Sequence, residues 1–243
     1  MSKFFRLIIF VCWCFTLFGA EDKIYKIGTD TNFPPFEFRN EDGKLIGIDM
    51  DLLEAIAEDQ KFEYKIYELG FKQSLNALET GKLDAVMASV NITEERKLKY
   101  DFSDPYFKTG TALAVEKNTN LNSYDGLKGK FITVKRNTLS SKVAEDLAKK
   151  YKFYIMYLDS SLSLAQDVAF KMSYACFDDS AFLKYHIKEG VNIKIVVEDE
   201  EHIDCGLAVK KGENEELLKK INKGLENLKK NGKYEEIINK YID

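Results

Sequence analysis

Predicted strands and helices alternate along this chain, and the alternation starts again after Pro105. In the first half, apolar residues recur at helical spacing over residues 48–57, between strand-like runs at residues 25–29 and 62–67. A further strand is expected over residues 84–88. Strands that alternate with helices favour a mostly parallel sheet covered by helices. The segment before Pro105 therefore predicts one α/β unit.

The second half repeats this arrangement. An amphipathic helix is expected over residues 140–150, and a strand over residues 206–210 precedes two helical stripes that Gly232 separates. Further strands are expected over residues 112–116, 131–134, 153–157 and 175–177. Two α/β halves followed by helices that need a surface predict two lobes, the first discontinuous in sequence. The expected boundaries are residues 21–111 and 206–243 for lobe 1, and residues 112–205 for lobe 2.

The first twenty residues differ from the rest. Lys3 and Arg6 precede an apolar run over residues 7–18, and a cut after Ala20 would follow two small residues. This pattern is typical of a secretory signal peptide, and the run is shorter than the ~20 residues that span a membrane. We therefore expect residues 1–20 to direct export to the periplasm and then to be removed. An uncleaved N-terminal anchor is the alternative.

Composition argues against several classes of protein. The formal net charge of the chain is -4 and no block of basic residues stands out, so a nucleic-acid partner is not expected. Outside the leader, Cys176 and Cys205 could form a disulfide or remain buried free thiols, the interpretation that we favour. The histidines are His186 and His202, and no CxxC or HxxxH pattern occurs, so neither a metal nor a cofactor is expected.

Polar residues that could hold a ligand follow the strand expected over residues 84–88. They are Ser89, Asn91, Thr93 and Arg96. Thr93 can cap a helix, whose free N–H groups and partial positive charge attract an anion. The planar guanidinium of Arg96 can hold a carboxylate with two hydrogen bonds. The stretch predicts a carboxylate site, unless Arg96 merely pairs with Asp101 on the surface.

Two strand ends in the second half carry similar groups. Lys135 and Thr138 lie between a predicted strand and the helix over residues 140–150, where an ordinary helix cap is the alternative. Asp179 follows the strand over residues 175–177, and an acid there suits either an ammonium group or a helix cap. Ligands of open α/β sheets bind outside the carboxyl ends of the strands, so these residues are candidates for a site.

The fourth stretch follows the first strand. Asp30 and Phe33 come directly after residues 25–29, which places an acid and an aromatic ring near the same edge. Phe71 could join Phe33 against a ligand, although an isolated Phe is more often part of a core.

Several segments match one family pattern. The most specific is Ile92-Thr93-Glu94-Glu95-Arg96 followed by Asp101-Phe102-Ser103-Asp104-Pro105-Tyr106. The others are Gly28-Thr29-Asp30 with Phe33-Pro34-Pro35-Phe36-Glu37-Phe38, Gly43-Lys44-Leu45-Ile46-Gly47-Ile48-Asp49-Met50-Asp51-Leu52, and Leu83-Asp84-Ala85. With them the chain resembles, over essentially its whole mature length, the polar amino-acid-binding proteins of bacterial ABC importers, often called solute-binding family three. The resemblance implies a type II periplasmic-binding-protein fold: two α/β lobes joined by two crossing hinge strands, near residues 110–116 and 203–210.

The resemblance also implies how the backbone groups of an amino acid would be held in the cleft. Arg96 would take the α-carboxylate, helped by amides near Thr138 and at the helix that Thr93 caps. Asp179 would take the α-ammonium group. Further acceptors would come from Ser89 and Asn91.

The side chain of the ligand would meet other residues. Phe33 and Phe71 would line its aliphatic part, and Asp30 and Lys135 would face its far end. The pairing of an acid with a lysine at these two places is most similar to the glutamine-binding members.

The chain departs from the family pattern in two places. A loop that is often glycine-rich is Arg136-Asn137-Thr138-Leu139 here. The Gly-x-x-Asp-Ala pattern that usually leads to the ammonium-binding acid is replaced by Lys171-Met172-Ser173-Tyr174-Ala175. Backbone approach to a ligand at the first loop is therefore an open question at this point.

The sequence thus predicts the binding component of an ABC importer, a monomer that closes on a free amino acid, most specifically glutamine, and delivers it to a membrane permease without catalysis. A binding protein for arginine or lysine is the first alternative. Others are a prephenate or arogenate dehydratase of the same fold and a sensor module of a larger receptor, because fold alone does not fix function.

Overall fold

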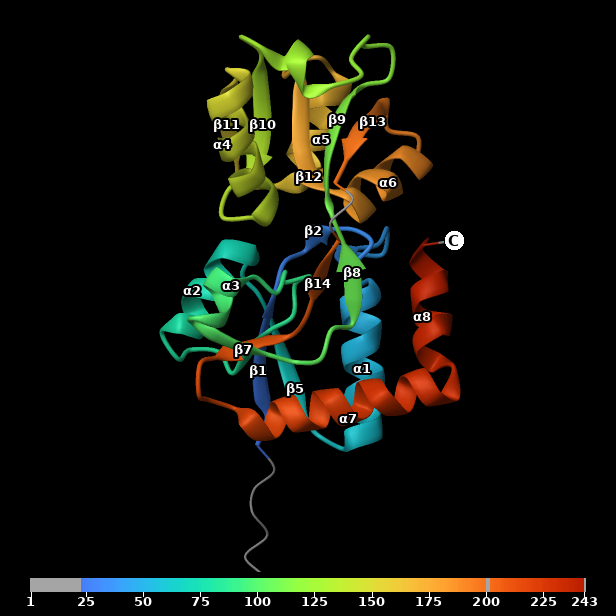
Figure 1. Cartoon of the computed structure of the whole chain (residues 1–243). Helices are drawn as coiled ribbons and strands as arrows, with labels where there is room; N and C mark the ends of the chain where they lie inside the picture. Colours follow the sequence, from blue (N-terminus) through green and yellow to red (C-terminus); the bar gives the residue numbers. More distant parts are fainter. Residues whose placement is uncertain (1–22, 200–201, 243) are drawn as a thin grey trace, which may run out of the picture.

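The computed structural model describes residues 23–199 and 202–242, and it shows two α/β lobes connected by a pair of strands (Figure 1). The α/β fold of two lobes expected from the sequence is confirmed. The predicted leader, residues 1–20, lies outside the described residues.

Lobe 1 is built on a five-stranded sheet in the order β5-β1-β6-β15-β7. Its strands are β1 (Tyr25–Thr29), β5 (Tyr64–Glu68), β6 (Ala85–Val86), β7 (Tyr100–Phe102) and β15 (Ala208–Lys210). β1 pairs in parallel with β5 and β6, whereas β15 is antiparallel to β6 and β7. The chain therefore leaves lobe 1 after β7 and returns to the same sheet through β15.

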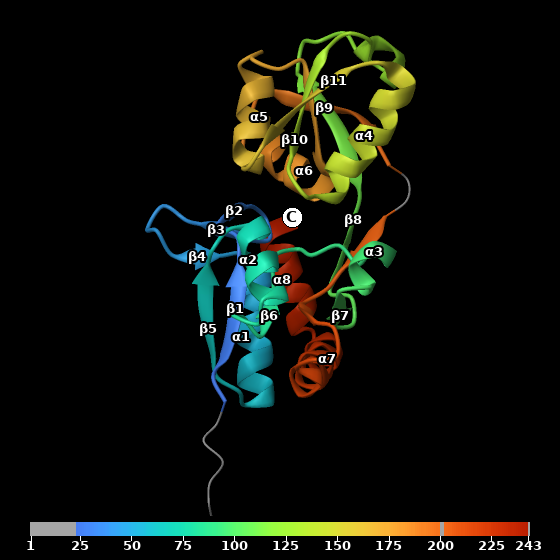
Figure 2. The same ribbon diagram turned by 90° about the vertical axis from the view of Figure 1, so that its left-hand side faces the viewer.

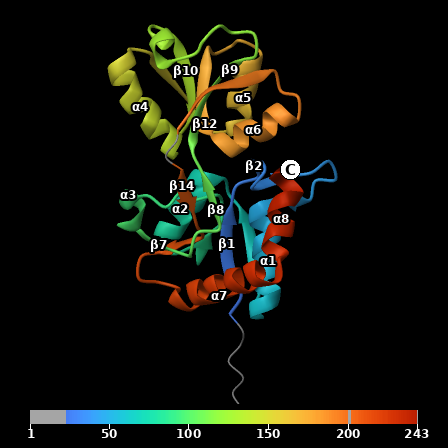
Figure 3. The same cartoon turned by 45° about the vertical axis from the view of Figure 1, so that its right-hand side comes forward.

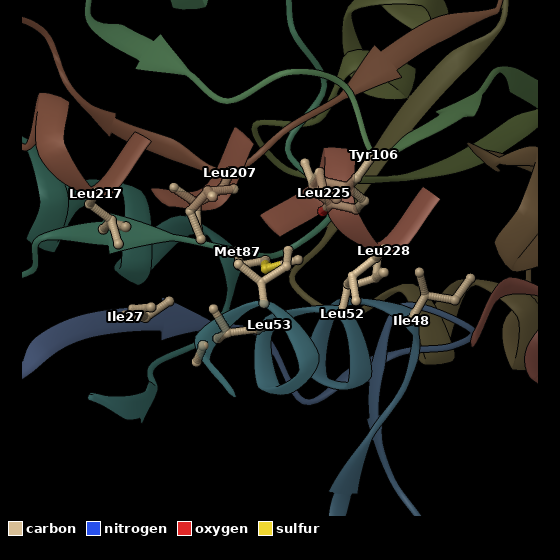
Figure 4. Packing of buried hydrophobic residues seen from close by; sticks show 14 of the residues in the cluster. Ile27, Ile48, Leu52, Leu53, Met87, Tyr106, Leu207, Leu217, Leu225 and Leu228 are labelled. Atoms are coloured by element: carbon tan, nitrogen blue, oxygen red, sulfur yellow. The ribbon is translucent and has the colours of Figure 1, made fainter. Parts of the chain in front are cut away.

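The helices of lobe 1 bury the apolar stripes that the sequence displays. They are α1 (Ile48–Gln60), α2 (Phe71–Glu79), α7 (Glu215–Asn231) and α8 (Lys233–Ile242), whereas the four-residue α3 (Glu94–Lys97) has no buried residue. Leu53 of α1, Leu225 of α7 and Ile27 of β1 belong to one core cluster (Figure 4). Gly232 separates α7 from α8 in the left-handed conformation that favours glycine, with φ of 80°. The stripes interrupted at Gly232 are thus two helices, as predicted.

A small sheet of lobe 1 lies at the boundary with lobe 2 (Figure 2). It consists of β2 (Asn32–Phe33), β3 (Glu37–Arg39) and β4 (Leu45–Ile46). The strands are joined as antiparallel neighbours, and the turn between β3 and β4 includes Gly43 at φ of 77°. This sheet carries Phe33 and Glu37 to the side of lobe 1 that meets lobe 2.

Lobe 2 has its own five-stranded sheet in the order β11-β10-β12-β9-β13. Its strands are β9 (Thr111–Glu116), β10 (Phe131–Lys135), β11 (Tyr154–Leu158), β12 (Ala175–Asp179) and β13 (Ile193–Glu198). Its helices are α4 (Leu139–Tyr151), α5 (Ser161–Ala169) and α6 (Ser180–Lys188), with a 3₁₀ turn, η1 (Tyr124–Leu127). β10 is parallel to β11 and β12, and the sheet has separate apolar clusters on its two faces.

Two antiparallel strands, β8 (Phe107–Thr109) and β14 (Ile203–Cys205), connect the lobes (Figure 2). The prediction that the first crossing occupies residues 110–116 is wrong, because residues 111–116 are β9, whose side chains are all buried within lobe 2. The crossing comes earlier, in β8 and Gly110. In the second predicted crossing, residues 203–210, β14 crosses and β15 already belongs to the lobe 1 sheet.

The terminal elements lie together in lobe 1, where β1, α7 and α8 are neighbours of the same core (Figure 3). Four elements of lobe 2, namely η1, α5, α6 and β13, were not predicted from the sequence. Within residues 23–199 and 202–242, we find no helix with the length and apolar character needed to cross a bilayer.

Candidate functional site

A cavity lies where the two lobes meet, at the ends of β6, β10 and β12 and at the start of β9. Its walls are formed by Phe33, Glu37, Phe71, Ala88, Ser89, Asn91, Gly110, Thr111, Lys135, Thr138, Leu139, Ser140, Asp178 and Asp179. Strand carboxyl ends are where α/β sheets hold ligands. Its volume is about 30 Å³, which is room for about two water molecules.

The structure brings most of the predicted site residues to this one place. Those on the cavity wall are Phe33, Phe71, Ser89, Asn91, Lys135, Thr138 and Asp179. Arg96 lies with Thr138 on an adjoining hollow of about 270 Å³ between α2, α3 and the start of α4. Asp30 is not among the residues of the cavity wall but forms an ion pair with Lys135, which is.

Arg96 is held by backbone carbonyl groups from both lobes. Its Nη1 donates to the Asn91 carbonyl at 3.0 Å, and its Nη2 donates to the Asn137 carbonyl at 3.2 Å. Its guanidinium carbon lies 5.3 Å from the centre of the Phe71 ring. Burial lowers the pKa of Arg96, and the described residues include no carboxylate in an ion pair with it. Asp101, the alternative partner, is paired with Lys211 instead, so that alternative is wrong.

Helix starts flank the guanidinium on both sides. Thr93 caps α3 by accepting from the Arg96 N–H at 3.2 Å, and Thr138 caps α4 by accepting from the Ser141 N–H at 3.1 Å. α3 has only four residues, whereas α4 has thirteen and points the N–H groups of its first turn toward the boundary of the lobes. The cap expected at Thr93 is confirmed, and the second stretch forms the ordinary helix cap that was its alternative. The helix starts and Arg96 together favour an anion at this position.

The loop before α4 retains a glycine-like backbone although it has no glycine. Asn137 has φ of 62°, in the left-handed region that Asn tolerates better than most residues. This conformation directs the Asn137 carbonyl to Arg96 across the boundary of the lobes. The absence of glycine from this loop therefore does not prevent its backbone from closely approaching Arg96 of the other lobe.

Lys135 and Asp30 form an ion pair between the lobes. Lys135 Nζ lies 2.7 Å from Asp30 Oδ2, and the two side chains are 7% and 11% exposed. The ammonium group also lies 5.1 Å from the Phe33 ring centre and 5.7 Å from that of Phe71. Burial acts to raise the pKa of Asp30, but the charge and hydrogen bond of Lys135 and the Thr31 N–H outweigh it and hold the pKa below its ordinary value. Asp30 is therefore held as a carboxylate against the Lys135 side chain.

Asp179 caps helix α6, which is one of the two roles, ammonium binding or helix cap, that the sequence left open. Its Oδ1 accepts from the N–H groups of Ala181 and Phe182 at 2.9 and 3.3 Å, and from the Thr109 hydroxyl at 2.7 Å. Burial raises the pKa of Asp179 to about 7, and the neighbouring Asp178 adds to the rise. A cap and a ligand contact are compatible, because a carboxylate has two oxygens and these contacts use only Oδ1.

Glu37 is a cavity-wall residue that the sequence analysis missed. It is 1% exposed and lies near the carboxyl group of Asp49, which is fully buried on α1 and whose N–H donates to the Phe36 carbonyl at 2.9 Å. Burial raises the pKa of both groups, and each lies in a family motif segment. The sequence signal that could have found it is an acid directly between two phenylalanines. Burying an ionised carboxylate costs free energy unless it has a partner, so an acid in such an apolar segment indicates a buried polar partner.

The remaining side-chain chemistry is limited in the part of the chain that the structure describes. Cys176 and Cys205 are both buried free thiols, in β12 and β14. No cluster of His, Cys, Asp and Glu in residues 23–199 and 202–242 could hold a metal ion.

Two α/β lobes, a two-stranded crossing and a polar cavity between the lobes define a type II periplasmic binding protein. Residues 25–243 match the bacterial extracellular solute-binding proteins, family 3, and the chain belongs to this family. It is 33% identical over 230 residues to the ABC transporter glutamine-binding protein GlnH of Bacillus subtilis. The alignment covers 91% of this chain and 81% of that protein.

Solved structures agree with this assignment. An ancestral arginine-binding protein bound to arginine is 38% identical, with a TM-score of 0.84 over 90% of this chain and 98% of that one. The second substrate-binding domain of Lactococcus lactis GlnP in its open conformation is 34% identical, with a TM-score of 0.64 over 91% of this chain and 96% of that one. The lobes of this protein thus have an arrangement more similar to the arginine-bound structure than to the open one.

Proposed function

We propose that this protein captures free L-glutamine outside the cytoplasmic membrane, as a monomer, and presents it to the permease of an ABC importer. In this proposal Arg96 binds the α-carboxylate, with amides of the loop before α4, and Asp179 with Ser89 and Asn91 binds the α-ammonium. The support is that these groups lie on one cavity and its adjoining hollow, and that the family binds solutes outside the cell.

The Lys135–Asp30 pair is the observation that favours glutamine. A cationic side chain at this end of the cavity would find Asp30 already neutralised and would meet the Lys135 ammonium, which is 7% exposed. A like-charge contact in such a desolvated place costs several kcal/mol. A neutral amide can accept from Lys135 with its oxygen and donate to Asp30 with its nitrogen, so both charges keep a partner.

Entry of the ligand requires the lobes to part. A cavity of about 30 Å³ is too small for an amino acid, and the direct 2.7 Å contact occupies the place of the amide. Glutamine would enter an open cleft and separate Lys135 from Asp30 as the lobes close on it. The hinge strands β8 and β14 provide the connection about which the lobes can move.

Arginine is the second candidate, because one of the similar structures is an arginine-binding protein with arginine bound. It requires Lys135 to leave the cleft, which the flexible lysine stem permits if the lobes open. The two candidates therefore predict opposite effects of removing the lysine.

The test is a thermal-shift screen of the purified protein against the twenty amino acids, followed by calorimetry on those that raise the unfolding temperature. We expect L-glutamine to give the largest shift. Lys135→Ala should weaken glutamine binding and gain affinity for arginine. Lys149→Ala is the matched control, because it removes an equal charge from lobe 2 at an exposed position, where Lys149 pairs with Asp146, and it should change neither preference.

Arginine or lysine displacing labelled glutamine from the wild-type protein at equal concentration would contradict the glutamine proposal. Prephenate is assayed in parallel for elimination of water and carbon dioxide. Turnover of prephenate would show that the protein is a dehydratase of the same fold.

A further inference from the structure

Two buried carboxyl groups lie close together at the cavity wall. Glu37 on β3 and Asp49 on α1 are 1% and 0% exposed, and the Asp49 N–H donates to the carbonyl of Phe36, next to Glu37, at 2.9 Å. Glu37 Oε2 and Asp49 Oδ1 are buried and receive no hydrogen bond from a protein donor in the described parts of the chain. An ionised carboxylate can only accept, so two ionised groups could not satisfy each other.

We propose that Glu37 and Asp49 share one proton at neutral pH, and that the pair positions Ser89 on the wall of the amino-acid cavity. The proton lies between Glu37 Oε2 and Asp49 Oδ1 and satisfies both atoms. The pair then has one negative charge instead of two.

The hydrogen bonds around the pair indicate where the negative charge lies. Asp49 Oδ2 accepts from the Ser89 N–H at 2.8 Å and from the Tyr106 hydroxyl at 2.9 Å. Those donors favour the ionised form of Asp49. Glu37 is therefore the protonated member of the pair, and its O–H donates a hydrogen bond to the Asp49 carboxylate. Glu37 is then a neutral part of the cavity wall.

Asp49 holds Ser89 in a backbone conformation that is unfavourable for a residue with a side chain. Ser89 has φ of 45°, in the left-handed region that is unfavourable for a residue with a Cβ. Its N–H is held by Asp49, and its hydroxyl contacts the Cys205 thiol at 3.5 Å. The proton on Glu37 therefore acts on the ligand site through Asp49 and Ser89, as a positioning device.

Loss of the proton would place two negative charges in a fully buried position. The charged and titratable groups around the pair are Asp30 after β1, Tyr106 before β8, Lys135 on β10 and Cys205 on β14. Lys135 is the cation among these groups and is committed to Asp30. The second charge would thus lack a partner, and folding must be linked to retention of the proton.

The experiment compares the unfolding equilibrium of the wild type with that of Glu37→Gln, without ligand, from about pH 6 to about pH 8. The amide that Glu37→Gln introduces would donate to Asp49 at every pH, whereas wild-type folding must bind a proton that the unfolded chain releases. The unfolding constant of the wild type, relative to the variant, should therefore rise about tenfold for each pH unit. Asp179 contributes equally to both curves. Asp49→Asn, in which the new amide would donate to Glu37, should remove the same dependence.

Parallel stability curves for wild type and Glu37→Gln would overturn the shared proton. The positioning role is tested by calorimetry with L-glutamine, and L-arginine in parallel, at about pH 7. Glu37→Leu, which leaves Asp49 Oδ1 without a donor, should bind at least about tenfold more weakly than Glu37→Gln, whose amide can donate to Asp49. Equal affinity in the two variants would overturn the role. This role rests on the proposed amino-acid site, but the stability comparison needs no ligand, so failure of one is distinguishable from failure of the other.

Discussion

At the scale of single residues, Arg96 is a half-buried charge without a carboxylate partner among the described residues. Its guanidinium is fixed by two carbonyl groups and the Phe71 ring rather than by a carboxylate. Removing a largely desolvated, charge-assisted contact costs roughly 2–5 kcal/mol. Arg96→Ala should therefore weaken glutamine binding by about two orders of magnitude or more in calorimetry, and Arg96→Lys should restore it only in part, because a lysine cannot form two parallel bonds.

Arg136 offers a control of the same residue type on the same loop as Asn137. Its side chain is 49% exposed, pairs with Asp159 at 3.6 Å and does not line the cavity. Arg136→Ala should leave the affinity unchanged. Near-wild-type affinity in a folded Arg96→Ala protein would show that the carboxylate site is elsewhere.

Asp179 predicts a dependence of binding on pH. Burial and Asp178 raise its pKa to about 7, whereas an ammonium ligand favours the ionised form. Binding should therefore release a proton below about pH 7, and the affinity for glutamine should increase as pH rises toward that value, by at most about tenfold per unit. Calorimetry in buffers of different ionisation enthalpy measures the released proton.

Above the pKa of Asp179 this proton release should vanish, which provides an internal control at about pH 8. A heat of binding that does not depend on the buffer at about pH 6 would argue that Asp179 acts only as the cap of α6.

The residue types at the site were more predictable than their contacts. Arg96, Lys135 and Asp179 follow predicted strands, so their place could be inferred from the order of elements. The direct pairing of Lys135 with Asp30 could not, because it joins residues of different lobes. Glu37 was missed because its partner, Asp49, belongs to a helix that periodicity alone shows as an apolar stripe.

At the scale of elements, the loop between β10 and α4 tests whether backbone conformation prepares the site. Asn137→Val should destabilise the protein by roughly 1–2 kcal/mol, because a β-branched residue resists φ of 62°. It should also weaken glutamine binding, since the Asn137 carbonyl holds Arg96. Denaturant unfolding and calorimetry measure the two effects.

Asn137→Gly is the matched substitution, because glycine adopts this conformation without strain. It should keep both stability and affinity close to wild type. Equal losses in the glycine and valine variants would show that the Asn side chain, and not the backbone, is what matters.

The elements that sequence reasoning found have strong periodicity or clear ends. α4 was expected over residues 140–150 and spans Leu139–Tyr151, because Thr138 caps it and its apolar face is regular. β13 was missed, since most of its residues are only half-buried and its pairing with β9 is irregular. α6 begins directly after β12 at Asp179, without the turn residues that mark a boundary in a sequence.

At the scale of the whole molecule, the described arrangement has contacts across the cleft. Phe33 of lobe 1 stacks on Phe182 of lobe 2 with ring centres 5.1 Å apart, and Lys142 pairs with Glu95. Such contacts favour closure, and a ligand that touches both lobes adds to them. Small-angle scattering should therefore give a smaller radius of gyration with saturating glutamine than without it.

Phe182→Ala removes a stacking partner in lobe 2 that does not line the cavity. It should increase the radius of the ligand-free protein and leave that of the saturated protein nearly unchanged. A radius that does not respond to glutamine in either protein would mean that the lobes do not move on binding.

The connection of the lobes has a consequence for how this architecture can diversify. Lobe 2 is an insertion whose entry and exit are neighbours, since the Asp199 N–H donates to the Thr111 carbonyl at 2.9 Å. A chain of this design can exchange lobe 2 as a single cassette without reconnecting lobe 1. In the proposed site Arg96 and Asp30 would stay behind while Lys135 travels with the cassette, so each chimera between relatives would combine the acid of one parent with the residue at position 135 of the other, and its preference among amino acids should follow that new pairing.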